Sequence, residues 1–185
     1  MVTGRGIGVL SGGWALAALL ASGAAGAQEM ANVVPDPIAC PSTPVALPPE
    51  LSAWNSRTTL VAAGDAHGLT AARLEVGKAV DGGLRATPEV HFALRPEKPG
   101  GSVSFGGIFA FTITEPGKYR VALGSAAWID VVKGGAAVSS IAHGHGPDCS
   151  GIRKMVDFTL EPGDYQLQIS ANPESRLPLL IARLP

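Results

Sequence analysis

The sequence predicts an all-β protein, an antiparallel β-sandwich of jelly-roll type with an extended Pro-rich N-terminal arm. Three observations lead to this fold class. Apolar and polar residues alternate with a period of two through most of the chain, a Glu-Pro-Gly turn motif occurs twice, and no segment carries a convincing helical stripe. Together they favour short strands joined by turns.

The first residues have the pattern of a secretory leader. Arg5 precedes an uncharged apolar run over residues 7–21, and the small residues Ala25, Gly26 and Ala27 follow as a signal peptidase requires. We therefore expect residues 1–27 to be a signal peptide and the protein to be periplasmic or secreted. Retention of this segment as a membrane anchor is the alternative, and its Gly and Ala content argues against that.

Composition limits the remaining chain to one domain and a restricted set of partners. The arm covers residues 28–50 and the β-domain residues 51–185. With 14 Lys+Arg against 15 Asp+Glu, the formal net charge is −1, which argues against a nucleic-acid partner. We expect no membrane span after the leader.

The chain contains two cysteines, Cys40 and Cys149. In an exported protein they predict one disulfide that joins the arm to the far end of the domain. The two cysteines are 109 positions apart in the sequence. The chain-entropy model assigns a stabilisation of about 4.7 kcal/mol to a disulfide that closes a loop of about that length. The alternative makes Cys149 a metal ligand and leaves Cys40 free, which an oxidising compartment disfavours.

Strands are predicted from the alternation of apolar residues. Val90, Phe92 and Leu94 alternate with polar or small neighbours, and from Val103 to Ile113 the odd positions form an apolar face. We count roughly eight to ten strands, a number typical of a sandwich. Further strands are expected at residues 127–132, 136–142, 154–160 and 179–184, whereas 70–76 suits a short helix or a strand.

A short internal repeat supports this assignment. Residues 111–123 and 158–169 both read as a strand, the motif Glu-Pro-Gly-x-Tyr, and a second strand. Proline presets the first dihedral of a turn and glycine accepts a positive φ, so each motif predicts a hairpin whose two strands pair. Tyr119 and Tyr165 are expected on the same face as the apolar residues that follow them.

His143 and His145 form the sharpest candidate site. Residues two apart on an extended strand point to one side, so both imidazoles can reach one ion. Asp148 is the nearest carboxylate, and His143, His145 and Asp148 are the predicted metal ligands, with iron or copper as the metal. The alternative is a glycine-flanked loop whose histidines are solvated. Other candidate ligands are His67, His91, Asp130 and Cys149.

A second candidate site is a binding face around Trp128. If the odd residues of 127–132 face the core, Trp128 and Asp130 point outward, and His91 and Arg120 have the same parity on other strands. An indole with a carboxylate and a guanidinium suits a sugar or a polar small ligand. The alternative places Trp128 in the core and lets Asp130 bond a neighbouring loop.

Two resemblances extend this interpretation. The Glu-Pro-Gly-x-Tyr motifs resemble those of secreted jelly-roll modules of the pre-peptidase and carbohydrate-binding types. Residues 96–102 (PEKPGGS), 119–132 and 142–155 (AHGHGPDCSGIRKM) resemble a group of small exported alphaproteobacterial proteins, some of which are labelled homogentisate dioxygenase. That label implies a mononuclear iron enzyme of cupin type.

The residues match the cupin pattern only in part. His143-Gly144-His145 fits its first motif, but Cys149 stands where the motif has a Glu, and no histidine follows His145. An iron triad would have to use Asp148 or Asp157. We therefore expect an exported, non-enzymatic binding or envelope accessory protein, with a small-molecule, glycan or envelope-protein partner. The alternatives are an iron dioxygenase that uses the same histidines and a carbohydrate-binding module.

Overall fold

A computed structural model describes residues 40, 42–43 and 45–185. The predicted signal peptide and most of the Pro-rich arm therefore lie outside the described residues. The described part is mostly β-structure, which confirms the all-β prediction. Its strands are β1 (Thr58–Val61), β2 (Ala79–Gly83), β3 (Arg85–Ala86), β4 (Phe105–Ile113), β5 (Gly117–Leu123), β6 (Trp128–Lys133), β7 (Ala136–Ala137), β8 (Ser140–Gly144), β9 (Lys154–Leu160), β10 (Gly163–Asn172) and β11 (Arg176–Arg183). Three 3₁₀ helices join them, η1 (Pro49–Asn55), η2 (Ala66–Thr70) and η3 (Thr87–Glu89).

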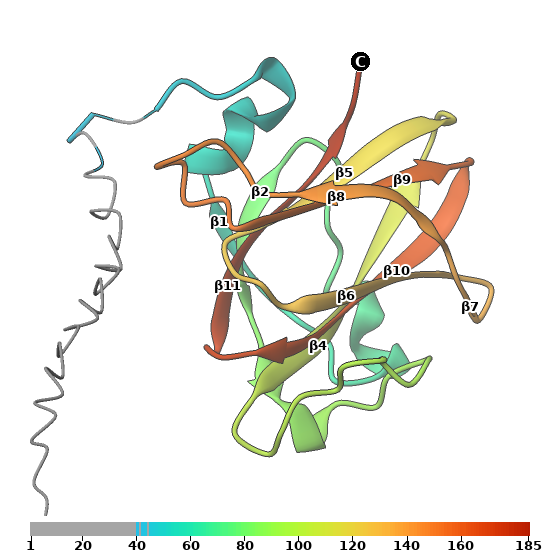
Figure 1. Cartoon of the computed structure of the whole chain (residues 1–185). Helices are drawn as coiled ribbons and strands as arrows, with labels where there is room; N and C mark the ends of the chain where they lie inside the picture. The colour runs from blue at the N-terminus through green and yellow to red at the C-terminus, as the bar shows by residue number, and fades with distance from the viewer. Residues whose placement is uncertain (1–39, 41, 44) are drawn as a thin grey trace, which may run out of the picture. The chain divides into compact units, whose positions relative to one another are not determined.

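The strands form two sheets that lie one above the other in Figure 1. One sheet has the order β1-β2-β11-β5-β9-β8 and the other β3-β4-β10-β6-β7. All neighbouring strands are antiparallel except β1 and β2, which are parallel. We call them the six-stranded and the five-stranded sheet.

The hydrophobic core contains side chains from both sheets. Phe109 and Leu167 come from the five-stranded sheet, and Leu123 and Leu179 from the six-stranded sheet, and none of the four is exposed. Along β5 the residues Tyr119, Val121 and Leu123 all join this core, as the alternation predicted. Strand β4 is more deeply buried than expected, because Ile108 and Ala110 on its other face are also covered.

The Glu-Pro-Gly-x-Tyr motifs do not close hairpins, so that prediction was wrong. Strand β4 belongs to the five-stranded sheet and β5 to the six-stranded sheet, and β9 and β10 are divided between the sheets in the same way. Each motif is thus a corner at which the chain passes from one sheet to the other. Turn residues specify a sharp bend, but the packing of the flanking strands decides whether they pair with each other.

In both corners the tyrosine hydroxyl bonds back to the glutamate four residues earlier. Tyr119 Oη donates to the Glu115 carbonyl at 2.8 Å, and Tyr165 Oη donates to the Glu161 carbonyl at 2.7 Å. This arrangement is the tyrosine corner of β-sandwich proteins. The Tyr165 hydroxyl also accepts from the Glu161 backbone N–H and from Lys133 Nζ, both at 3.1 Å.

The two corners lie side by side because their strands pair with each other. β4 pairs with β10 and β5 pairs with β9, so that Tyr165 is opposite Phe111 and Tyr119 is opposite Phe158. The rings of Phe111 and Tyr165 stack with their centroids 5.3 Å apart. The internal repeat of the sequence is therefore one arrangement, a Phe opposite a Tyr, made twice.

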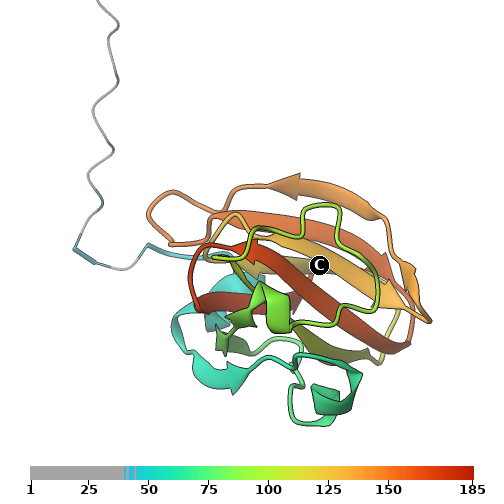
Figure 2. The ribbon, with the colours of Figure 1, turned by 90° about the horizontal axis from the view of Figure 1, so that it is seen from below.

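A loop over residues 90–104 covers part of the outer face of the five-stranded sheet. The strand predicted at residues 90–95 is absent from the described structure, where this segment has no regular element. The buried Gln168 side chain on β10 takes the place of a strand partner, since it accepts from the Leu94 N–H and donates to the Leu94 carbonyl, both at 3.0 Å. Ser170 Oγ donates to the Lys98 carbonyl at 2.8 Å. Figure 2 shows this loop in green in front of the strands.

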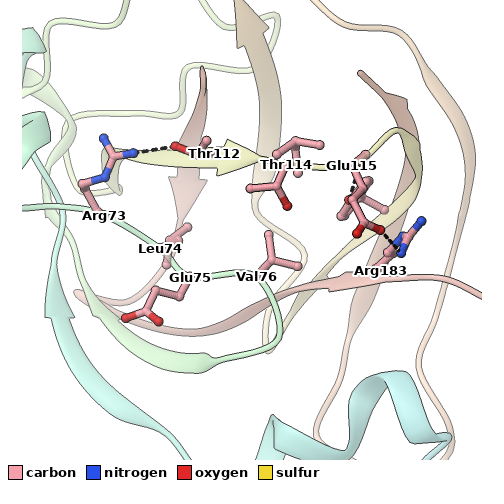
Figure 3. Close-up of a pocket in the computed structure, with 10 residues that line it drawn as sticks. Arg73, Leu74, Glu75, Val76, Thr112, Thr114, Glu115 and Arg183 are labelled. Atoms are coloured by element: carbon pink, nitrogen blue, oxygen red, sulfur yellow. Dashed lines mark hydrogen bonds and ion pairs between the residues drawn. The ribbon is translucent and has the colours of Figure 1, made fainter. Parts of the chain in front are cut away.

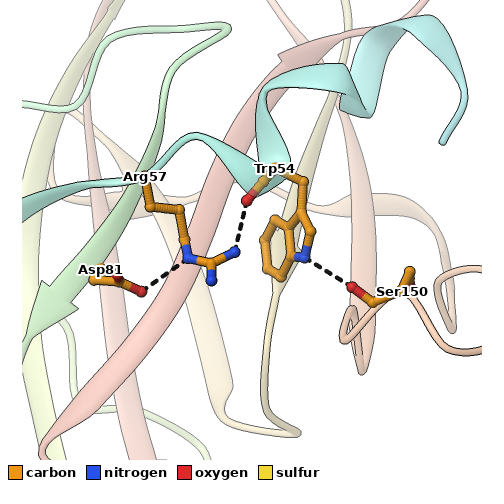
Figure 4. Close-up of polar contacts among 4 residues, drawn as sticks. All are labelled: Trp54, Arg57, Asp81 and Ser150. Carbon is orange, nitrogen blue, oxygen red and sulfur yellow. Dashed lines mark hydrogen bonds and ion pairs between the residues drawn. The ribbon is translucent and has the colours of Figure 1, made fainter. Parts of the chain in front are cut away.

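The central part of the outer face of the six-stranded sheet is covered by η1 and by the segment around Cys149. Trp54 of η1 is buried, and its Nε1 donates to the Ser150 carbonyl at 3.0 Å. Arg57 lies beside the indole, 5.6 Å from its centroid, and bonds Asp81 at 3.0 Å (Figure 4). The packed side chains form a second apolar cluster of Leu51, Trp54, Ala79, Ala122, Ile152, Leu180 and Ala182.

The predicted disulfide between Cys40 and Cys149 is present, with a Cα–Cα distance of 5.4 Å. Of residues 70–76, which were considered for a short helix or a strand, Thr70 ends η2, and residues 71–76 form no regular element apart from a single bridge between Arg73 and Ala110. The described residues contain no helix that is long and apolar enough to cross a membrane.

Replacing Cys40 and Cys149 together by serine should lower the free energy of unfolding by about 2–5 kcal/mol, because the open chain gains conformational freedom over the 109 residues between them. Urea unfolding of the oxidised protein and of the double variant measures the difference. The reduced wild-type protein is the control and should match the variant. A difference below about 1 kcal/mol would contradict a stabilising role.

The tyrosine corners predict unequal costs for loss of the hydroxyl. Tyr119→Phe removes one hydrogen bond and should cost about 1 kcal/mol, whereas Tyr165→Phe removes three and should cost about 2 kcal/mol. Each variant serves as the matched control for the other in urea unfolding. Equal costs would show that the additional bonds of Tyr165 contribute nothing.

Candidate functional site

A cavity of about 330 Å³ lies where the chain passes from the five-stranded to the six-stranded sheet. Strand β6 forms one side and strands β8 and β9 the other, and Val138, in the link between β7 and β8, completes it. Its lining residues are Trp128, Ile129, Asp130, Val131, Val138, Ser140, His143, Lys154, Val156 and Phe158. We call it the Trp128 cavity. Its volume is within the range of small-molecule sites.

The cavity is open because β7 is short. β7 pairs with β6 only at Val132 and Lys133, and the bond from Val138 N to the Val131 carbonyl, 2.8 Å, ends the contact. In the described structure, no strand pairs with β6 along Trp128–Asp130 on this side. Side chains that lie between the two sheets therefore remain accessible at this point.

The floor of the cavity is apolar. Val131, Val156 and Phe158 are part of the main core and less than one tenth exposed, and Val138 is half-buried against the same core. Their side chains can therefore offer an apolar contact surface without having to leave the core.

The rim of the cavity carries polar groups arranged around Trp128. The half-buried indole donates its Nε1–H to both carboxylate oxygens of Asp130, at 3.2 Å each. Lys98 Nζ lies 5.2 Å from the ring centroid and Lys154 Nζ 5.5 Å from it, both within cation–π range. Trp128 thus touches a carboxylate and two ammonium groups.

The Lys154 side chain extends to the rim from the core-facing side of β9. It has the same parity on β9 as the core residues Val156 and Phe158, and its Nζ donates to the Ala127 carbonyl at 2.8 Å. Burial lowers the pKa of Lys154, the neighbouring charge of Lys98 lowers it further, and Asp130 acts in the opposite direction.

Asp130 is affected by the same surroundings. Burial raises the pKa of Asp130, mainly because a carboxylate loses hydration between the sheets, and the charge of Glu97 adds to the effect. The hydrogen bond from Trp128 and the charge of Lys154 act in the opposite direction. Both charged side chains at the rim are therefore held where water is partly excluded.

Of the four residues predicted for ligand binding, the structure brings Trp128 and Asp130 together. His91 is exposed at the start of the covering loop, where its backbone N–H donates to the Gly64 carbonyl at 2.7 Å. His91 is not among the residues that line the Trp128 cavity.

Arg120 lies on β5 in the other sheet. It makes a bidentate pair with Asp157, at 2.7 and 2.8 Å, and approaches Glu50 at 3.8 Å. The hydrogen bond to Asp157 raises the pKa of Arg120, and the two carboxylates explain how its charge is held on a covered sheet face. The alternation correctly predicted that Arg120 lies on the outer face of its strand. However, β5 belongs to the six-stranded sheet, whereas Trp128 lies on β6 in the five-stranded sheet.

The predicted metal ligands are divided between two cavities. His143 lines the Trp128 cavity, whereas His145 and Asp148 line a second hollow beside the disulfide. The chain leaves β8 at Gly144, so His145 no longer shares a strand face with His143. Instead, His145 Nδ1 bonds the Arg153 carbonyl at 2.9 Å. Among the described residues, no group of three or more His, Cys, Asp or Glu side chains could hold a metal ion.

Another hollow, of about 670 Å³, lies beside the first tyrosine corner (Figure 3). Its charged groups are already paired. Arg183 bonds Glu115, Arg73 donates to Thr112 Oγ1 at 2.6 Å, and Glu75 pairs with Lys78. Because these charged groups already have partners, they would gain little from a charged ligand. The Trp128 cavity is therefore the stronger candidate.

No protein-family model matches the sequence, and no curated protein matches it. The candidate site is therefore derived from the chain's own residues.

The interpretation of the sequence missed Lys98, Lys154 and the apolar floor of the cavity. A signal for Lys154 was present, since a charged residue shares the parity of Val156, Phe158 and Leu160 in the predicted strand 154–160. A lysine at a core-facing position is rare unless it has a specific partner. Lys98 gave no such signal, because the covering loop has no period that relates it to β6.

The rim predicts coupled titration of Lys154. Its pKa should lie below that of an exposed lysine, rise when Lys98→Met removes the neighbouring positive charge, and fall when Asp130→Asn removes the negative one. Carbon-13 NMR of dimethylated lysines over a pH series measures this, with Lys154→Arg to assign the signal. A Lys154 pKa that neither variant changes would refute this description of the rim.

Proposed function

We propose that this protein is an exported binding module that takes a small molecule into the Trp128 cavity. The observation that carries the proposal is the combination, in one opening between two sheets, of an apolar floor with a polar rim that holds an indole, an ammonium and a carboxylate. Such a combination is typical of small-molecule sites, where apolar surface supplies affinity and a few polar groups supply orientation.

Export is part of the proposal and rests on the predicted leader together with the disulfide. A bond between Cys40 and Cys149 is compatible with an oxidising compartment such as the periplasm. Envelope-protein partners fit the same location.

We also propose the jelly-roll type for the fold. The strand orders β2-β11-β5-β9 and β4-β10-β6-β7 support it, since they follow from one long hairpin folded over on itself, with the two tyrosine corners among its crossings. In this arrangement the cavity occupies the end of the roll at which β6, β7 and β8 follow one another.

A carbohydrate ligand is the second candidate, and it would use the same site. Trp128 and Asp130 are the side chains that favour it, as a stacking surface and a hydrogen-bond acceptor. However, Lys98 Nζ and Lys154 Nζ lie 5.2 and 5.5 Å from the indole centroid, so a stacked sugar would share the ring with two ammonium groups.

The iron dioxygenase hypothesis fits the described residues less well. It requires His143 and His145 to share an ion with a carboxylate, and these histidines line different cavities. A metal bound by His143 and His145 would be detected by elemental analysis of the purified protein and lost when both are replaced by alanine.

Filling the cavity should abolish ligand binding. We expect at least one compound in a panel of alkyl acids, alcohols, amines, amino acids and sugars to shift the Trp128 indole N–H resonance in a saturable manner. Val138→Phe should remove that response by placing a larger side chain in the cavity. Two-dimensional NMR of the nitrogen-15 protein measures it, with Trp128→Phe to assign the resonance.

Val103→Phe is the matched control, because Val103 is 87% exposed and lies outside the cavity lining. It should keep the response of the wild-type protein. A panel that leaves the Trp128 resonance unchanged in the wild-type protein, or a response that Val138→Phe leaves intact, would refute the proposed site.

A further inference from the structure

We infer that the ligand of the Trp128 cavity is an amphipathic carboxylate, a molecule with a compact apolar body and one anionic head. The body would lie on the floor between the sheets, and the head would meet Lys154 at the rim. This inference rests on the proposed function, because it names the ligand class of the same cavity.

The floor provides for the apolar body. Val131, Val156 and Phe158 present branched and aromatic side chains from both sheets, and Val138 adds another from the link between β7 and β8. A ligand of many hydroxyl groups would lose hydrogen bonds to water there without replacement. An alkyl or aryl body would instead gain the burial of its apolar surface.

The rim provides hydrogen-bond donors for the head. Lys154 has three N–H donors and uses one on the Ala127 carbonyl. Ser140 and His143 line the same cavity from β8, and no hydrogen bond ties their side chains to another described residue. Asp130 is the one carboxylate of the lining, and both its oxygens accept from Trp128. The groups that remain available therefore favour an acceptor with negative charge.

Neither Lys154 at the rim nor Lys98, which contacts the Trp128 ring but does not line the cavity, has a salt-bridge partner within the described part of the chain. Lys98 and Lys154 approach the same indole ring, and the charge of Lys98 acts on Lys154. Asp130 acts on Lys154 as an opposite charge without a salt bridge, and Glu97 acts on Asp130 as a like charge. Two neighbouring ammonium groups, one of them half-buried, are stabilised when an anion binds between or beside them.

A series of eight-carbon probes separates the contributions of body and head. Octanoate, octanol and octylamine have similar apolar bodies with a negative, a neutral and a positive head, and acetate has the head without the body. We expect octanoate to bind most tightly, octanol at least tenfold more weakly, and octylamine and acetate not measurably. Titrations followed at the Trp128 indole N–H resonance measure these affinities.

Lys154→Met tests the assigned head contact. It keeps the length and apolar stem of the side chain, and it should weaken octanoate binding about tenfold or more while weakening octanol binding much less. Octanol binding that persists in the variant also shows that its cavity is intact. Lys118→Met, on the exposed part of β5 in the six-stranded sheet, is the matched control and should change neither affinity.

The rim lysine gives a second measurement that does not depend on the tryptophan. Bound octanoate should raise the pKa of Lys154, since an anion beside it favours the charged form, and octanol should not. Binding of octanoate should also weaken as ionic strength increases, whereas binding of octanol should not.

The outcomes distinguish this inference from the proposed function. Equal binding of the three eight-carbon probes, or tighter binding of octylamine, would overturn the anionic head and leave a binding cavity in place. If sugars bind and none of these probes does, the prediction of a ligand with an apolar body is overturned. The absence of any response at Trp128, across these probes and the wider panel, would refute the cavity as a binding site and the inference with it.

Discussion

The antiparallel pairing of the two tyrosine corners is the constraint on which the arrangement of the other strands depends. Because β4 pairs with β10 while β5 pairs with β9, both sheets are held at one end by the same four strands. The buried hydroxyl groups of Tyr119 and Tyr165 fix the distance over which the chain crosses between the layers. β11 then pairs beside β5, and β6 beside β10, so the remaining elements extend these pairs outward.

This architecture also explains where the Trp128 cavity opens. The central part of the outer face of the six-stranded sheet is covered by η1 and the residues near the disulfide, and the outer face of the five-stranded sheet is partly covered by the loop over residues 90–104. The two-residue strand β7 leaves the edge of β6 uncovered, and the core becomes accessible there. Lys154 and Asp130 occupy this opening because charged groups can keep part of their hydration at the mouth of a core but not inside it.

Trp128 has a different role from the one its sequence context suggested. A partly exposed indole beside a carboxylate was expected to serve as a platform for a ligand. In the structure its N–H holds Asp130 and its ring contacts two lysines, so it positions the polar groups of the rim as well as lining the cavity. The electrostatic character of the site follows from Lys154 and Lys98, which come from a strand and a loop that lie far apart in the sequence.

The sequence by itself determined the β class, the disulfide partners, most strand positions and which residues face the core, because these depend on alternation and on the presence of two cysteines. It also placed Trp128 and Asp130, which are two apart on one strand, on the same side of that strand. Only the tertiary structure decided that the Glu-Pro-Gly turns join different sheets, that Arg120 lies away from Trp128, that His143 and His145 face different cavities, and that Lys154 reaches the indole. These outcomes depend on which strands become neighbours, and local alternation carries no information about pairing between distant segments.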